Sequence, residues 1–96
     1  EPIGADIECL RPVSGAMRTR FHAANDADFW RLWVQRESRC KRAGISAVAL
    51  RDREVPSFPN ERVFALEPFP DYTASVCTCS DADVDKLIYL TVKELI

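Results

Sequence analysis

Hydrophobic and polar residues alternate along several short stretches of the chain, and this period of two predicts β-strands. β-Branched and aromatic residues are frequent in these stretches, and turn residues such as Pro12, Gly44 and Pro59 separate them. Seven short strands predict an all-β fold, a two-sheet antiparallel β-sandwich. The predicted strands are residues 3–10, 17–23, 29–35, 45–50, 63–66, 72–78 and 87–95.

A helix is the main alternative for two stretches, residues 27–37 and 84–95. In the second stretch, Val84, Leu87 and Ile88 share one helix face. The aromatic and β-branched content, together with the short spacing between turn signals, favours strands in both places.

The stretch from Leu66 to Tyr72 predicts a rigid turn that leads into a strand. Pro68 and Pro70 each fix the backbone φ angle, and Tyr72 begins an alternating run. This Leu-x-Pro-x-x-x-Tyr pattern resembles the tyrosine corner of a fibronectin type III domain, in which the tyrosine ring fills a corner between two sheets.

The resemblance to the fibronectin type III family covers most of the chain. Residues 72–76 are similar to the family's F strand, and residues 30–34 occupy the place of its C strand. Phe21 stands where the family usually has a core tryptophan, and the four cysteines are closer to domains of the cytokine-receptor type. The resemblance therefore implies a divergent member. An immunoglobulin domain fits less well, because Cys9 precedes the second predicted strand.

Length and charge limit the possible functions. The 96 residues form one domain, residues 1–96, and the net charge of −2 argues against nucleic acid or an anionic membrane as a partner. No apolar run reaches the roughly 18 residues that cross a bilayer, so no membrane insertion is expected. The chain begins at Glu1 without a signal-peptide pattern, and we interpret it as a module excised from a larger protein.

Four cysteines in a short chain predict disulfides, and disulfides indicate an extracellular or cell-surface location. Cys77 and Cys79 lie two apart on one predicted strand, about 6.5–7 Å along it, so each is expected to pair elsewhere. On the resemblance, Cys40 ends a strand beside the F strand, which favours a link to Cys77 or Cys79, with Cys9 as the remaining candidate. Four reduced thiols in an intracellular scaffold or regulatory module are the alternative.

The chain carries no known motif for catalysis or cofactor binding, so we expect neither an enzyme nor a cofactor. His22, the one histidine, alternates outward, and no motif places a nucleophile beside it. A cysteine-dependent metal or redox domain is a weaker alternative, because Cys-x-Cys with two isolated cysteines matches neither zinc nor redox spacing.

Aromatic and basic residues supply the candidate binding surface. Phe29, Arg31 and Trp33 are expected to face outward from their strand, and aromatic and arginine side chains are enriched among interface hot spots. The basic cluster that follows suits a sulfated glycan or an acidic partner, or else forms a solvated hairpin. Its arginines are Arg36, Arg39 and Arg42. Phe58, Phe69 and the adjacent prolines are a second candidate apolar patch.

The sequence thus predicts a non-catalytic protein-recognition or spacer module of a larger receptor, adhesion or secreted protein. Its expected partner is another protein, whether a receptor, a ligand or a neighbouring domain, with no role for nucleic acid.

Overall fold

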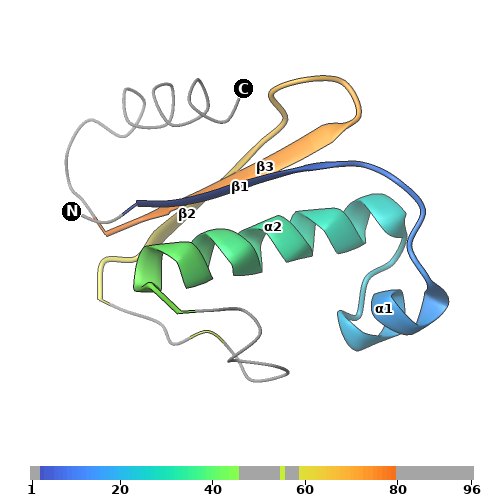
Figure 1. The fold of residues 1–96 in the computed structure, drawn as a ribbon, viewed down its shortest axis with the longest axis horizontal. Helices are drawn as coiled ribbons and strands as arrows, with labels where there is room; N and C mark the ends of the chain where they lie inside the picture. Colours follow the sequence, from blue (N-terminus) through green and yellow to red (C-terminus); the bar gives the residue numbers. More distant parts are fainter. Residues whose placement is uncertain (1–2, 46–54, 56–58, 80–96) are drawn as a thin grey trace.

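The computed structural model describes residues 3–45, 55 and 59–79, which form a three-stranded sheet and a long helix packed against it (Figure 1). A second, short helix lies at one end of the long one. In chain order the elements are β1 (Ile3–Cys9), α1 (Gly15–Arg20), α2 (Asp26–Ala43), β2 (Arg62–Leu66) and β3 (Tyr72–Thr78).

β3 is the central strand of the sheet. It pairs antiparallel with β1 on one side, where Asp6 lies opposite Ser75, and antiparallel with β2 on the other, where Ala65 lies opposite the same serine. β1 and β2 therefore run parallel to each other. α2 connects them in the sequence and packs along the sheet (Figure 1). This arrangement is a split β-α-β unit, with the antiparallel strand inserted between the two parallel ones.

The predicted all-β sandwich is wrong, because the described residues form a small mixed α/β domain with a single sheet. Three of the predicted strands are correct: residues 3–10, 63–66 and 72–78 coincide closely with β1, β2 and β3. Alternation identified these strands because each is short and bounded by turn residues.

Two predicted strands are helical instead. Residues 17–23 overlap α1, and residues 29–35 lie inside α2, so the helix considered as the alternative for 27–37 is the correct interpretation there. The basic segment that follows is the second half of α2 and no hairpin. The stretches 46–50 and 84–95 lie outside the described residues.

The N-terminus of α2 is capped by two side chains that act reciprocally. Oδ1 of Asn25 accepts a hydrogen bond from the backbone N–H of Asp28 at 2.8 Å. The Asp28 carboxylate reaches back and accepts from the N–H of Ala24, also at 2.8 Å. Asp26 and Asp28 also place negative charge at the positive end of the helix dipole.

The C-terminus of α2 ends in a Schellman motif. Gly44 adopts a left-handed backbone with φ 71°, and its N–H donates to the Lys41 carbonyl at 3.2 Å. The N–H of Ile45 donates to the Cys40 carbonyl at 2.9 Å, and the Ile45 side chain packs on the cluster of Cys40 and Val55. Signals at both ends thus outweigh the β-propensity of the aromatic residues inside this helix.

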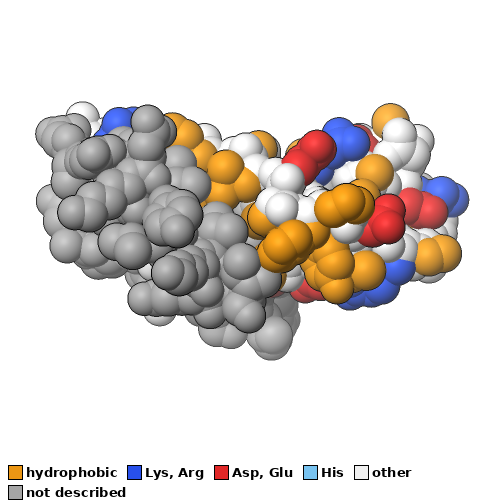
Figure 2. Space-filling view, turned by 90° about the horizontal axis from the view of Figure 1, so that it is seen from above, with side chains coloured by type: hydrophobic (Ala, Val, Ile, Leu, Met, Phe, Trp, Pro, Cys, Tyr) orange, Lys and Arg blue, Asp and Glu red, His pale blue; other side chains and the backbone are white. Residues whose placement is uncertain are grey.

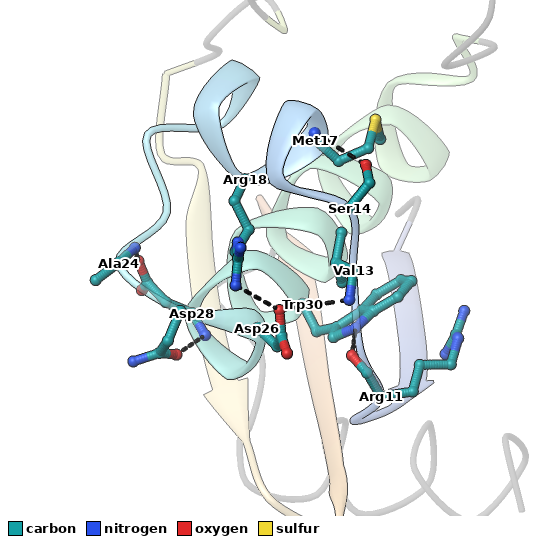
Figure 3. A network of polar contacts seen from close by, with 10 residues as sticks. Arg11, Val13, Ser14, Met17, Arg18, Ala24, Asp26, Asp28 and Trp30 are labelled. Atoms are coloured by element: carbon teal, nitrogen blue, oxygen red, sulfur yellow. Dashed lines mark hydrogen bonds and ion pairs between the residues drawn. The ribbon is translucent and has the colours of Figure 1, made fainter.

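Polar contacts tie α1 and the loop before it to the start of α2 (Figure 3). Ser14 caps α1, since its Oγ accepts from the N–H of Met17 at 3.2 Å. One carboxylate oxygen of Asp26 accepts from the Arg18 guanidinium at 3.2 Å and from the Val13 N–H at 3.4 Å. The first residues of α2 therefore hold α1 in place.

Aromatic rings fill the junction between the two helices. The ring of Phe29 lies 4.9 Å from those of both Phe21 and Trp30, and Trp33 contacts the same group. Trp30 also donates from Nε1 to the Arg11 carbonyl at 2.9 Å, while the Arg11 guanidinium lies 3.8 Å from a Trp30 ring centroid. Trp30 thus anchors the chain leaving β1 to α2 (Figure 3).

The segment from Leu66 to Tyr72 is a hairpin turn between neighbouring strands, and the predicted corner between two sheets is wrong. β2 ends at Leu66 and β3 begins at Tyr72 within the same sheet. The Tyr72 side chain is 40% exposed instead of filling a corner. The resemblance to a fibronectin type III domain therefore loses the feature that supported it most, while the turn into a strand is confirmed.

The two faces of the sheet differ in chemical character. Ser75 contacts Ser38 of α2, so Ser75 points toward the helix. Every second residue of β3 from Ser75, and the residues of β1 and β2 opposite them, lie on the same side of the sheet. This face is mainly small and polar: Gly4, Asp6, Glu8, Thr73, Ser75 and Cys77, with Val63 and Ala65 on β2. The opposite face is mainly apolar: Ile3, Ala5, Ile7, Cys9, Phe64, Leu66, Tyr72, Ala74 and Val76.

Gly4 is the point of closest approach between β1 and α2. A Cβ atom at this position would overlap backbone atoms of Ser38 and Arg42, so no side chain fits there. Gly4 pairs with Cys77 on β3, and Ser38, Ser75 and Cys77 are all fully buried. Small residues thus allow the helix backbone to lie directly on the sheet.

We expect Gly4→Ala to lower the free energy of unfolding by about 1–3 kcal/mol, because the added methyl group must push β1 away from the α2 backbone. Gly15→Ala is the matched control: a Cβ there meets only the Arg18 side chain at 3.8 Å, and alanine favours the helix. Urea denaturation followed by circular dichroism measures both. Equal stability of the two variants would contradict the close approach.

Candidate functional site

A layer of polar side chains lies between α2 and the sheet, and it contains the buried hydroxyl and charged groups of the domain. The Ser38 and Ser75 hydroxyl oxygens are 3.0 Å apart, and both residues have no exposed surface. The Ser38 hydroxyl also donates to the Gln35 carbonyl at 2.9 Å. Buried hydroxyls that bond each other in this way satisfy their own hydrogen-bonding needs.

Two arginines of α2 hold one carboxylate at the start of β2. Glu61 accepts from Nε of Arg39 at 2.8 Å and from the Arg42 guanidinium at 2.6 Å. The Glu61 and Arg42 side chains are only 10% and 7% exposed. Arg39 additionally donates to the Val55 carbonyl at 3.1 Å. This ion-pair cluster fastens the last turns of α2 to the chain that enters the sheet.

We expect Glu61→Ala to lower the free energy of unfolding by about 3–5 kcal/mol, because it leaves the buried Arg42 charge without its carboxylate. Arg18→Ala is the control: it breaks the exposed pair with Asp26, whose two side chains are 42% and 39% exposed, and should cost less than about 1 kcal/mol. Thermal or urea denaturation compares them. Similar losses in both variants would show that the cluster at Glu61 is not buried.

A second charged pair joins β1 to the last turn of α2. The Lys41 ammonium donates to Oδ1 of Asp6 at 2.9 Å, while Oδ2 of Asp6 is buried and, in the part of the chain that the structure describes, has no hydrogen-bond partner. Burial raises the pKa of the nearby Glu37 carboxyl, and the charge of Asp6 raises it further, against the opposing effect of Lys41.

This shift predicts how Glu37→Gln changes stability with pH. The pKa of Glu37 is higher in the folded protein than in the unfolded chain, so its charged form destabilises the fold above the folded pKa. Glutamine removes this penalty, and we expect a higher free energy of unfolding at pH 7. The gain should shrink as the pH falls through the folded pKa and vanish below the ordinary glutamate value.

Denaturation at several pH values measures that gain, and an NMR titration of Glu37 in the Asp6→Asn variant tests its cause. The pKa of Glu37 should be lower in that variant than in the wild type, because the negative charge of Asp6, which raises this pKa, is gone. A constant stability difference between pH 7 and pH 4 would contradict the proposed shift.

These interior groups bond to one another and tie α2 to the sheet. Their donors and charges face one another across the layer between helix and sheet. Among the described residues, no three histidine, cysteine, aspartate or glutamate side chains are grouped closely enough to hold a metal ion. No helix in the described residues is long and apolar enough to span a membrane.

The outer end of the β2–β3 hairpin carries the most exposed aromatic side chains in the described residues. Phe69 and Tyr72 are 38% and 40% exposed, and their rings pack edge to face with centroids 6.0 Å apart. Tyr72 lies opposite Cys9 of β1, and Leu66 opposite Ala74, on the apolar face of the sheet. We call this group the hairpin surface: Ile7, Cys9, Leu66, Phe69 and Tyr72.

Seen from above the sheet, hydrophobic side chains cluster within the part of the view that the described residues occupy, and charged side chains of both signs lie around them (Figure 2). The view looks onto the side away from α2, where the apolar face lies. Ile7, Cys9 and Leu66 are half-buried, while Phe69 and Tyr72 stand out from them. An apolar area with protruding aromatic rings is typical of an interaction site.

The hairpin surface is held in shape by its backbone. Pro68 and Pro70 restrict φ on both sides of Phe69. The N–H of Tyr72 donates to the Phe69 carbonyl at 3.3 Å, and the N–H of Leu10 donates to the Asp71 carbonyl at 2.7 Å, which joins the turn to the end of β1. A surface ordered in this way loses little further conformational entropy when a partner binds.

The three residues predicted to form an outward-facing contact do not share a surface. Phe29 is 1% exposed and belongs to the aromatic junction, so its predicted outward-facing position is wrong. Trp33 is half-buried against the same rings, and Arg31 is exposed on α2. In the predicted strand, Phe29, Arg31 and Trp33 would point to the same side. In the helix α2, Arg31 lies on a different face from the other two.

The predicted basic surface is divided by the helix as well. Arg39 and Arg42 turn toward Glu61, and Lys41 pairs with Asp6, so their charges are neutralised within the domain. Arg36 is half-buried. These internal pairs remove the support for a sulfated glycan or an acidic partner on this segment.

All four cysteines are free thiols in the structure, so the predicted link of Cys40 to Cys77 or Cys79 is not formed. Cys77 faces α2 beside Arg42, and burial raises the pKa of its thiol although the Arg42 hydrogen bond acts in the opposite direction. Burial also raises the pKa of the Cys40 thiol. Cys9 is half-buried on the apolar face, and Cys79 follows the end of β3.

Phe69 belongs to the predicted second apolar patch, whereas Tyr72 is predicted to fill a corner between two sheets. The signal for an exposed pair was present, since Phe69 lies between two prolines and two acidic residues, Glu67 and Asp71. Residues of this kind mark a turn at the surface. Phe58, the other aromatic of that patch, lies outside the described residues.

Comparisons with protein-family models, with curated proteins and with solved structures found no match to this chain.

Proposed function

We propose that this domain is a non-catalytic protein-recognition module and that it binds its partner through the hairpin surface. The observation that carries the proposal is the pair formed by Phe69 and Tyr72, whose rings contact each other and yet remain 38% and 40% exposed. Aromatic side chains at the centre of an apolar area supply most of the binding energy in many interfaces.

Two further features support recognition at this place. The turn is fixed by its prolines and by the bond between Leu10 and Asp71, so the aromatic pair is presented in one arrangement. On the same face Ile7, Cys9 and Leu66 are half-buried apolar neighbours of this pair, whereas Ala74, between Ile7 and Leu66, is 1% exposed. A contact area of this kind extends beyond a single exposed ring.

The interior chemistry favours binding over catalysis. The thiols of Cys40 and Cys77 have raised pKa values, which disfavours the thiolate that a redox or nucleophilic cysteine requires. Arg39 and Arg42 of α2 are engaged with Glu61. The recognition role expected from the sequence is therefore kept, but its location moves from Phe29, Arg31 and Trp33 to the hairpin.

Panning a random peptide library, with peptides of about 16 residues, against the folded domain tests this function. We expect peptides that bind the wild type and whose affinity falls at least about tenfold in the Phe69→Ser variant, as for a residue that dominates an interface. Val63→Ser is the matched control. Val63 is 37% exposed but lies on the opposite face of the sheet, and its replacement should leave binding unchanged.

Circular dichroism and unfolding midpoints of both variants verify that each remains folded. Peptides that bind wild type and Phe69→Ser equally well, or that respond equally to Val63→Ser, would contradict recognition by the hairpin surface. Failure to enrich any peptide dependent on Phe69 would do the same.

A further inference from the structure

The charged side chains within the hairpin turn itself, residues 67–71, are both acidic. Glu67 and Asp71 lie at the two ends of the turn, on either side of Phe69, and both are exposed. Within residues 3–45 and 59–79, neither carboxylate forms an ion pair or a side-chain hydrogen bond that would neutralise it. The aromatic pair therefore stands between two free negative charges.

The nearest cation along the adjoining strand is already engaged. Arg11 follows the end of β1, and its guanidinium donates to Glu8 at 3.1 Å and to the Cys9 carbonyl at 2.8 Å while lying over the Trp30 ring. It is therefore held toward β1 and α2. The chain as a whole also has a net charge of −2, which adds to the negative potential at the hairpin.

We infer that the partner of the hairpin surface is a basic, amphipathic segment of another protein, in which apolar side chains are flanked by lysine or arginine. This inference rests on the proposed recognition function and adds the chemistry of the partner. Apolar side chains of such a segment cover Phe69 and Tyr72, and its cations pair with Glu67 and Asp71.

Charge argues against two other occupants. In a symmetric dimer the same patch meets itself, so two copies would bring Glu67 and Asp71 of one close to those of the other, which repel. The surface of an anionic membrane is repelled in the same way, because its headgroups carry the same sign as the turn. A cationic partner is the occupant that matches both the apolar area and its rim.

The test uses two synthetic helical peptides of about 14 residues with the same leucine positions, one with lysine and one with glutamate at all polar positions. Isothermal titration calorimetry with the wild-type domain should detect binding of the leucine–lysine peptide alone. Raising the salt concentration should weaken that complex, because exposed ion pairs are screened.

The double variant Glu67→Gln/Asp71→Asn removes the two charges with little change in shape. Asparagine tolerates the left-handed backbone of Asp71, where φ is 64°. We expect affinity for the leucine–lysine peptide to fall about three- to tenfold, the size given by two exposed ion pairs, and its salt dependence to disappear. Glu37→Gln is the control, since it removes one charge from α2 and should leave the affinity unchanged.

The outcomes separate this inference from the function on which it rests. Peptides that need Phe69 but bind regardless of charge would overturn the inference and leave recognition by the hairpin surface intact. Binding of both peptides that is insensitive to Phe69→Ser would count against both. Self-association of the wild type in light scattering that Phe69→Ser abolishes would overturn the inference in favour of a second copy.

Discussion

The direct contact between the backbones of β1 and α2 at Gly4 is the constraint on which the rest of the structure depends. Because no side chain separates them there, the helix lies low on the sheet, and only small or polar residues fit beneath it. Ser38 and Ser75 fill this narrow layer and bond each other. Larger groups are displaced to the two ends of the helix, where the aromatic junction and the cluster at Glu61 complete the packing.

This arrangement explains why the apolar side of the sheet faces away from α2. The helix makes its close contact with glycine and serine, so the larger aliphatic residues of the strands, such as Ile7 and Leu66, lie on the other face. The domain therefore has a polar layer beneath α2 and an apolar face on the other side of the sheet. Ala74 and Val76 of that face are buried, and Phe69 and Tyr72 extend it to the surface at the hairpin. The candidate site is a continuation of the fold's own hydrophobic face.

The three strands were predictable, because turn residues bound short alternating runs that each pair within the sheet. α2 was not, since alternation over residues 29–35 fits a strand as well as a helix, and the aromatic content favoured the strand. The caps at Asn25 and Gly44 are visible in the sequence, and giving them more weight would have identified the helix. The exposed pair of Phe69 and Tyr72 was harder to predict from the sequence, because the exposure of a side chain depends on which face of the sheet the neighbouring elements cover.

The position of β3 has a consequence for how the chain folds during synthesis. β3 is the last of the three strands to leave the ribosome, yet it provides the ladder hydrogen bonds for both β1 and β2. Until residues 72–78 emerge, β1 and β2 lack the strand that pairs with both of them in the described sheet, whereas the capped helices α1 and α2 already have their local contacts. Assembly of the sheet therefore waits until residues 72–78 have been synthesised, and it depends on contacts between distant parts of the sequence.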